Sequence, residues 1–342
     1  MSFCVLRTLN FAKDGSWNLC CRYPYQASKL QQTALQLPFN LRNSLKTSKW
    51  NFSRGSFGRR AENTFQDEYS FSRLWKPFLF TIGVGGVSIT GAAIWQYETA
   101  RSKNLQTRKI WESWVTPKYG QFRQHMHMWW NSLSAGDKVF APICFLNVLV
   151  YLAWRVPAWQ PVMMLYFTSG LAKGAVCWPM LLSTFSHYNI FHLGTNMFVL
   201  HSFSEGAVSS LGKEQFVAFY LSAGMVSSFT SYLYRAALRS PVTSLGASGA
   251  VMGVLAYVCS RHPNSKLAVI FLPQYPFEAS TGLKAIMCMD TVGCIARWSY
   301  LDHAAHLGGS LFGVFWHIFG YEYIWKKREP LVTAWHKLRG PL

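Results

Sequence analysis

The chain has 342 residues, of which 50% are hydrophobic and only 14% are charged. Soluble domains carry about 25% charged residues, so this composition excludes an ordinary soluble domain and predicts apolar segments with the charges gathered between them. The net charge of +19 suits nucleic acid or an anionic lipid surface. We expect no nucleic-acid partner, because the apolar segments place the chain in a lipid bilayer. The eight cysteines contain no CxxC pair, which favours buried thiols over disulfides or a zinc site.

Residues 1–60 are predicted to be a targeting segment. They contain ten Lys or Arg and a single acidic residue, Asp14, together with many Ser, Asn and Gln. A basic, serine-rich and acid-poor segment is typical of a mitochondrial transit peptide. The alternative interpretation is a basic tail that binds anionic lipid.

Apolar runs long enough for membrane-spanning helices follow the leader, since about 20 residues cross a bilayer. The first covers residues 77–96, and residues 97–138 then form a basic, aromatic-rich connector. A six-helix core is predicted over residues 139–321, with helices at 139–154, 192–204, 216–234, 245–259, 282–298 and 300–321. Residues 157–177 contain Pro and Gly and are expected to be a structured loop, and residues 322–342 form a basic C-terminal tail. The predicted fold is therefore an all-α polytopic membrane protein of one plus six helices.

A serine lies among residues with almost no side chain in the sequence Leu245-Gly246-Ala247-Ser248-Gly249-Ala250. Small neighbours allow another backbone, or a substrate, to approach the Ser248 hydroxyl closely. The alternative is a small-residue packing face, in which the serine bonds back to its own helix.

A cluster of polar residues, Asp302 to His306, lies inside a second apolar segment and precedes Gly309 and Gly313. A histidine in an apolar segment is costly to bury, and its default interpretation is functional. A serine and a histidine on two glycine-lined helices match the needs of a nucleophile and its base. His303 is a rival base, one turn before His306.

A third group of polar residues contains His187, His192 and Asn196. His192 and Asn196 are four residues apart, so they share one face of a helix. Their N–H groups are donors that could stabilise an oxyanion when a hydroxyl attacks an amide carbonyl. The alternative is interhelical hydrogen bonding without catalysis.

These motifs carry a resemblance to a known family. Gly246-Ala247-Ser248-Gly249 resembles the GxSG motif of rhomboid intramembrane serine proteases, and Ala305-His306 with Gly309 and Gly313 resembles their AHxxGxxxG helix. The pair His192 and Asn196 resembles the family's HxxxN element, and His187 falls at its additional upstream histidine. The extra N-terminal helix and the leader resemble the mitochondrial, presenilin-associated branch of the family.

The resemblance implies Ser248 as nucleophile and His306 as general base, with His192, Asn196 and the Ser248 backbone N–H as the oxyanion hole. His187 and the glycines of the two packing faces would support the site, namely Gly246, Gly249, Gly253, Gly309 and Gly313. It further implies cleavage of single-pass membrane proteins in or near their transmembrane helix, at the mitochondrial inner membrane. The resemblance implies a catalytic dyad of Ser and His, so Asp302 stays outside the predicted catalytic set.

Asp290 is an unexplained charge inside an apolar run. A proton path, a gate and a buried partner such as Arg297 are all open interpretations. No cofactor is expected. A metalloprotease is disfavoured because HExxH, whose glutamate is the base, is absent, so no bound metal is expected. The remaining alternative is a catalytically inactive rhomboid-like protein that binds the membrane or acts as a chaperone, or a small transporter that uses the polar cavity for binding.

Overall fold

The computed structural model describes residues 71–112, 120–171, 176–269 and 272–340. The predicted leader, residues 1–60, lies outside the described residues. The described part is mostly helical. Its longer helices are α4 (Trp75–Glu112), α5 (Gln121–Ser132), α6 (Ala135–Ala153), α9 (Ile190–Leu211), α10 (Lys213–Leu238), α11 (Ser248–Arg261), α12 (Ala279–Ile295), α13 (His303–Phe315) and α14 (Glu329–Arg339).

Local sequence explains where several of these helices begin and end. The Ser134 side chain accepts from the Asp137 N–H at the start of α6, and the Asn189 side chain accepts from the Phe191 N–H at the start of α9. Such caps satisfy N–H groups that have no partner inside the helix. Gly212 ends α9 with a φ of +80°, a conformation that glycine adopts without strain, and α10 begins at the next residue. The short turn therefore packs α9 and α10 as neighbours.

The centre of the bundle is the contact between α11 and α13, where two backbones meet with no side chain between them. A Cβ on Gly309 would lie 2.0 Å from the Gly249 carbonyl oxygen, and one on Gly313 would lie 2.3 Å from the Gly253 carbonyl oxygen. Only glycine fits at these positions, which is how small residues let membrane helices approach closely. On its other side α11 packs against α10, where a Cβ on Gly253 would lie 2.8 Å from the Ala223 Cβ.

Within the described residues, three helices are long and apolar enough to cross a membrane: Phe71–Leu105, Ala135–Ala153 and Lys213–Leu238. Helix α11 has 14 residues, so at 1.5 Å per residue it extends only about 21 Å, short of a 30 Å hydrocarbon core. Helix α13 continues without a break into a π-helical segment, Trp316–Trp325. The protein thus has several apolar helices around a shorter central one.

Helical structure extends beyond the predicted boundaries. The connector predicted over residues 97–138 consists largely of the end of α4, all of α5 and the start of α6. The predicted loop over residues 157–177 contains a one-turn helix and α7 (Gln160–Tyr166), and α8 (Cys177–Leu182) begins at its end. The end of α4 and α5 were not predicted as helices because their charged and polar residues break the uniform apolar composition of a spanning segment. Over residues 157–177 the Pro and Gly residues indicated a loop instead.

A β-hairpin and a C-terminal helix were also not predicted from the sequence. Strands β1 (Lys266–Val269) and β2 (Leu272–Glu278) form an antiparallel hairpin between α11 and α12, so the described chain is not purely α-helical. The basic C-terminal tail forms α14, which packs beside α4. Trp335 Nε1 donates to the Glu98 carboxylate at 2.9 Å, and Arg328 donates to the Gln96 side chain at 2.8 Å.

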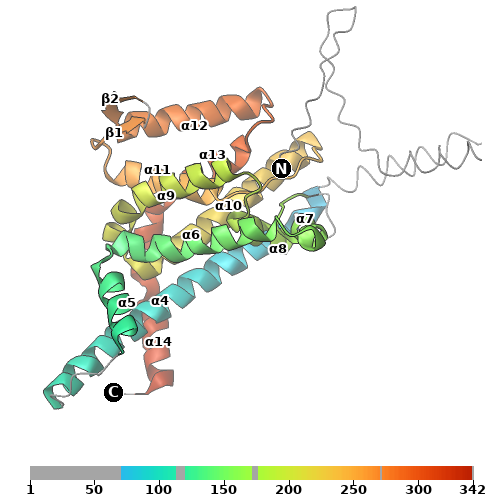
Figure 1. Cartoon of the computed structure of the whole chain (residues 1–342). Coiled ribbons are helices and arrows are strands. Elements are labelled where there is room, and N and C mark those ends of the chain that lie inside the picture. The colour runs from blue at the N-terminus through green and yellow to red at the C-terminus, as the bar shows by residue number, and fades with distance from the viewer. Residues whose placement is uncertain (1–70, 113–119, 172–175, 270–271, 341–342) are drawn as a thin grey trace, which may run out of the picture. The chain divides into compact units, whose positions relative to one another are not determined.

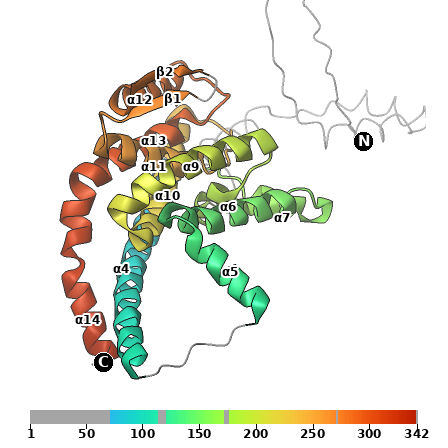
Figure 2. The same ribbon diagram turned by 60° about the vertical axis from the view of Figure 1, so that its left-hand side comes forward.

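The arrangement of the elements can be followed in two views. In Figure 1, α12 and the hairpin lie together at one end of the bundle, next to α11 and α13. In Figure 2, α4 and α14 run side by side at the opposite end, and α5 diverges from them. The α11–α13 contact therefore lies inside the bundle, enclosed by α9, α10 and α12.

Candidate active site

Ser248 is the first residue of α11, and the segment before it is fixed by backbone hydrogen bonds. Ser169 and Ser244 form an antiparallel bridge with N···O distances of 2.7 and 2.9 Å. Gly246 donates its N–H to the Ser183 carbonyl oxygen at 3.0 Å and has a φ of +135°, which a side chain would strain. These contacts hold the Ser248 hydroxyl at a defined position at the helix start.

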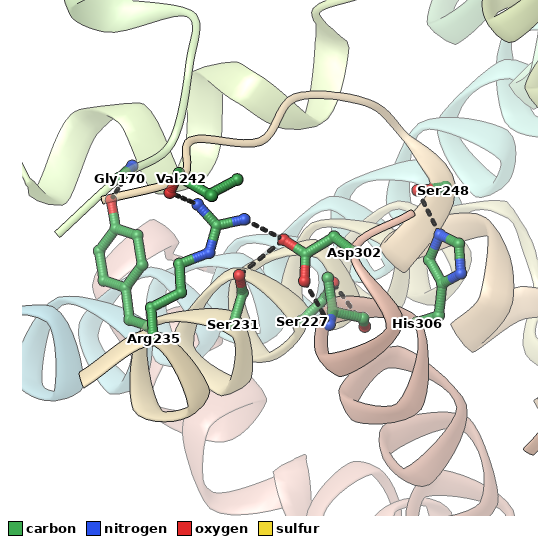
Figure 3. Close-up of polar contacts among 10 residues, drawn as sticks. Gly170, Ser227, Ser231, Arg235, Val242, Ser248, Asp302 and His306 are labelled. Carbon is green, nitrogen blue, oxygen red and sulfur yellow. Dashed lines mark hydrogen bonds and ion pairs between the residues drawn. The ribbon is translucent and has the colours of Figure 1, made fainter. Parts of the chain in front are cut away.

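The Ser248 Oγ lies 2.9 Å from Nε2 of His306 (Figure 3). His306 is buried on α13, and Ser248 is half-buried on α11. The two residues are 58 positions apart in the chain. They meet because the glycine contacts bring α11 and α13 close enough for a side-chain hydrogen bond. A serine hydroxyl at hydrogen-bond distance from an imidazole is the geometry of an activated nucleophile.

Asp290 on α12 lies behind the two histidines of α13. Its Oδ1 is 2.7 Å from His303 Nδ1 and 3.4 Å from His306 Nδ1, and the Asp290 side chain is fully buried. The buried partners of Asp290 are therefore histidines, and the interpretation that paired it with Arg297 is not supported, because Arg297 is exposed. A carboxylate at Nδ1 favours the tautomer that carries the proton there, which leaves Nε2 free to accept one.

His303 lies in a tight pocket of its own. Its ring packs edge-on against Trp298, with centroids 5.7 Å apart. A Cβ on Gly293 would lie 2.5 Å from the His303 ring. The Nδ1 atom of His303 is hydrogen-bonded to Asp290, and the His303 ring also lines the cavity that contains Ser248. Both histidines thus present Nδ1 to Asp290, and of the two it is His306 that also reaches Ser248, through Nε2.

The upstream histidines contact the loop that carries the serine. His187 is fully buried, and its Nε2 accepts from the Ala247 N–H at 3.3 Å. The His192 ring lies 5.0 Å from the His187 ring and covers Gly246, where a Cβ would lie 2.7 Å from His192 Cε1. His187 therefore supports the backbone just before Ser248, and His192 lies over the same turn.

Asn196 is placed differently from the other predicted donors. Its Nδ2 donates to the His192 carbonyl oxygen, one turn earlier on α9, at 2.8 Å. Ser248, His192 and His306 line a cavity beside the serine, and Asn196 is not among the described residues that line it. In this conformation the Asn196 amide is engaged with its own helix.

Beside the serine is a cavity of about 600 Å³. Ser248 and the three histidines form one wall, and residues 238–245 and 297–302 form much of the rest. A space of this volume admits a short stretch of extended peptide or several water molecules. The site can therefore bring a carbonyl group and water to the Ser248 hydroxyl.

Asp302 faces away from Ser248 and His306 (Figure 3). Its Oδ1 accepts from the Ala305 N–H at 3.1 Å and caps α13, while its Oδ2 pairs with Arg235 at 2.8 Å and accepts from Ser231 at 2.6 Å. Ser227 on the same face of α10 donates to the Ala305 carbonyl oxygen at 2.8 Å. These bonds fasten the first turn of α13, and thereby His306, to α10.

The fold and the site define a class of protein, a polytopic helical protein with a serine–histidine pair between two glycine-packed helices. The comparisons with known proteins point to the same class. The rhomboid domain family model matches residues 174–323. The chain is 47% identical over 285 residues to the human presenilin-associated rhomboid-like protein, mitochondrial, covering 81% of this chain and 75% of that protein. It is 50% identical to the mouse protein of the same name over the same shares. The chain belongs to the rhomboid family, within its mitochondrial presenilin-associated rhomboid-like branch.

A more distant relative extends the comparison to fungi. Rhomboid protein 1, mitochondrial, of Saccharomyces cerevisiae is 33% identical over 198 residues, which is 55% of this chain and 55% of that protein. With the apolar helices described above, these mitochondrial relatives make the chain a mitochondrial membrane protein.

Proposed function

We propose that this protein is an intramembrane serine endopeptidase of the mitochondrial inner membrane, with Ser248 as nucleophile and His306 as general base. The observation that carries the proposal is the 2.9 Å contact between Ser248 Oγ and His306 Nε2. A base must be within about 2.6–3.2 Å of the proton that it takes, and this pair satisfies that requirement before a substrate binds.

The proposed reaction begins when Ser248 Oγ attacks a peptide carbonyl carbon and its proton moves to His306 Nε2. The imidazolium is stabilised by the Asp290 carboxylate at Nδ1, which acts as a positioning group, as the third member of a triad does. His306 then gives the proton to the leaving amide nitrogen, and an acyl-serine remains. Water from the cavity, deprotonated by His306, releases the acid and regenerates Ser248.

The oxyanion formed on attack needs donors at the same wall of the cavity. The Ser248 backbone N–H is in the first turn of α11, where N–H groups have no partner within the helix. His192, which lines the cavity, supplies a ring N–H. We propose that Asn196 joins them only after its amide leaves the His192 carbonyl when substrate binds.

The proposed topology is one N-terminal helix before a six-helix core. Helix α4 is the added span, and α6, α9, α10, α11, α12 and α13 with its π-helical extension form the core. The rhomboid match over residues 174–323 supports α9 to α13 as core helices, whereas α4 and α6 both lie before it. We assign α6 to the core because it is joined to α9, where the Gly136 N–H donates to the Glu205 carboxylate at 2.7 Å. The short α11 lies within the core and would present Ser248 below the membrane surface.

The proposed substrates are single-pass membrane proteins, cut in or near their transmembrane helix. The site between α11, α12 and α13 opens on a cavity that is large enough for an unwound segment but not for an intact helix with its side chains. The mammalian relatives are named for an association with presenilin. For this chain the corresponding proposal is that its protein partners are themselves membrane proteins.

The test is labelling of the purified, lipid-reconstituted protein with a fluorophosphonate probe, alongside cleavage of candidate transmembrane substrates. Ser248→Ala should lose both labelling and cleavage, by at least about 10³-fold, while remaining folded. The matched control is Ser202→Ala, because Ser202 is exposed on α9 and bonds to its own helix. Full activity of Ser248→Ala would remove the serine mechanism, and a wild-type protein that neither labels nor cleaves would favour an inactive binding protein.

A further inference from the structure

Asp290, His303 and His306 form a buried cluster, here called the Asp290 cluster. It contains more potential metal-ligand atoms than a Ser–His dyad needs for catalysis. One ligand atom from each residue lies within 4.8 Å of the other two, and all three side chains are buried. The two imidazoles direct the same atom, Nδ1, at the same carboxylate oxygen. Among the described residues, the second oxygen, Asp290 Oδ2, has no hydrogen-bond partner.

We propose that the Asp290 cluster binds a divalent transition-metal ion, with zinc as the best fit, and that the bound ion switches the protease off. This inference rests on the proposed function for its inhibitory consequence, but the binding itself does not depend on activity. Two imidazole nitrogens and one carboxylate are a common zinc ligand set, and water supplies a fourth ligand.

The geometry is close to what zinc requires. Zinc–ligand bonds of about 2.0–2.2 Å place tetrahedral ligand atoms roughly 3.4 Å apart. Asp290 Oδ1 and His306 Nδ1 are already 3.4 Å apart, and Asp290 Oδ1 and His303 Nδ1, at 2.7 Å, must separate by several tenths of an ångström. A bound ion would take the place of the proton that each Nδ1 atom carries in the proposed tautomer. His303 and His306 line the cavity, which provides the route of entry.

Inhibition follows from the two nitrogens of one imidazole. A neutral imidazole carries one proton, so a metal on His306 Nδ1 leaves that proton on Nε2. Nε2 then donates a hydrogen bond and cannot accept the Ser248 proton. The proton shifts from Nδ1 to Nε2 within each histidine, through cavity water, so metal binding needs no oxidant and no net proton release from the two rings. The bound metal therefore removes the general base without touching the serine.

Binding is tested first with zinc chloride and the inactive Ser248→Ala protein in lipid, by isothermal titration calorimetry. This variant keeps every ligand of the Asp290 cluster, so we expect one high-affinity zinc ion per chain whether or not the proposed protease activity is real. Adding His303→Gln or Asp290→Asn should weaken that binding at least about tenfold. The control for adventitious binding is His201→Ala, which removes the exposed pair of His201 and Asp137.

Inhibition is then tested by fluorophosphonate labelling, with each variant compared with its own zinc-free rate. Zinc should suppress labelling of Ser248 in the wild-type protein, a chelator should restore it, and His303→Gln should blunt the suppression at least about tenfold. Melting temperatures of all variants identify any that fail to fold, and Asp290→Asn provides the second ligand variant for binding. Unchanged zinc affinity in both folded ligand variants overturns the site. Tight binding without suppression overturns the switch but leaves the serine mechanism intact.

Discussion

At the scale of single residues, the site separates two histidines that the sequence places one turn apart. His306 presents Nε2 to Ser248, whereas the Nδ1 atom of His303 is bonded to Asp290. Both lie on α13 and both present Nδ1 to Asp290 on α12, so the difference comes from the other side of each ring, where His306 meets Ser248 on α11 and His303 packs against Trp298. The catalytic assignment therefore depends on ring orientation and not on position in the motif.

We predict that His306→Ala eliminates cleavage and fluorophosphonate labelling, whereas His303→Ala leaves measurable activity. His306 is the imidazole within proton-transfer distance of Ser248. Side-by-side cleavage and labelling of the two single variants measures this difference. An inactive His303→Ala protein beside a His306→Ala protein that still labels would reverse the assignment of the base.

Asp290→Asn should lower kcat by about 10²–10⁴-fold, because the variant keeps the shape of the side chain but loses the charge that holds His306 in the productive tautomer. KM should stay nearly constant, since Asp290 lies behind the histidines and not among the residues that line the cavity. Steady-state kinetics on a reconstituted substrate separate the two constants. A rise in KM alone, or a loss of folded protein that accounts for the entire effect, would contradict a positioning role.

At the scale of elements, α13 is fixed by two neighbours with different chemistry. Helix α11 holds it through glycine contacts, where the Gly249 and Gly253 carbonyl oxygens fill the space that side chains would need. Helix α10 holds its first turn through Ser227, Ser231 and Arg235, which are spaced four apart and so share one face. Apolar contact sets the distance between helices, and the polar bonds set the position of α13 along its axis.

The pair of Arg235 and Asp302 gives a prediction at this scale. Both side chains are largely buried, with 6% and 13% of their surface exposed. Asp302→Asn leaves the Arg235 charge without its partner, which should cost about 3–5 kcal/mol of folding free energy. Thermal unfolding in detergent measures the loss, and cleavage should fall as the start of α13 loosens.

The matched control is Lys266→Ala, which breaks the pair with Glu278 on the hairpin. That pair is exposed, at 62% and 48%, so its contribution should not exceed about 1 kcal/mol. Equal melting temperatures for Asp302→Asn and the wild-type protein would show that the buried pair does not hold the first turn.

At the scale of the whole molecule, the helices outside the core lie toward the two ends of the chain. Helix α14 packs on α4 through Trp335 and Glu98, and Arg339 lies 3.3 Å from the same carboxylate. The C-terminal segment is thereby joined to α4, and the bonded residues are between 232 and 241 positions apart in the chain. Both lie apart from α11 and α13, so they anchor the bundle without entering the site.

The leader gives a prediction for the whole chain. The ten basic residues against one acidic residue within residues 1–60 favour import into mitochondria and removal of the segment. N-terminal sequencing of the protein purified from mitochondria should begin well past Met1. A leader whose arginines and lysines are replaced by glutamine is the control, and it should fail to import. A mature protein that retains Met1, or one found in the secretory pathway, would contradict the prediction.

The sequence by itself determined the class of protein, because apolar runs and short motifs are local properties. Membership of the rhomboid family and mitochondrial location were predicted from the GxSG stretch, the histidine motifs and the basic leader, and both are confirmed by the comparisons. The assigned roles of Ser248 and His306 stay predictions until the chemistry is measured. Boundaries were less well predicted, since α5, α14 and the hairpin carry charged or mixed residues that resemble a connector and a tail.

Only the tertiary structure decided what Asp290, Asp302 and Asn196 contact. Asp290 reaches His303 and His306 because α12 packs against α13, and no sequence spacing reports the packing of one helix on another. Asp302 was left outside the predicted catalytic set, and its partner Arg235 is 67 residues away in the chain. Asn196 shares a helix face with His192, as the spacing of four predicted, yet its amide bonds back to the His192 carbonyl. Spacing along a helix fixes which residues share a face, whereas side-chain partners are chosen by the neighbouring helices and by competing backbone groups.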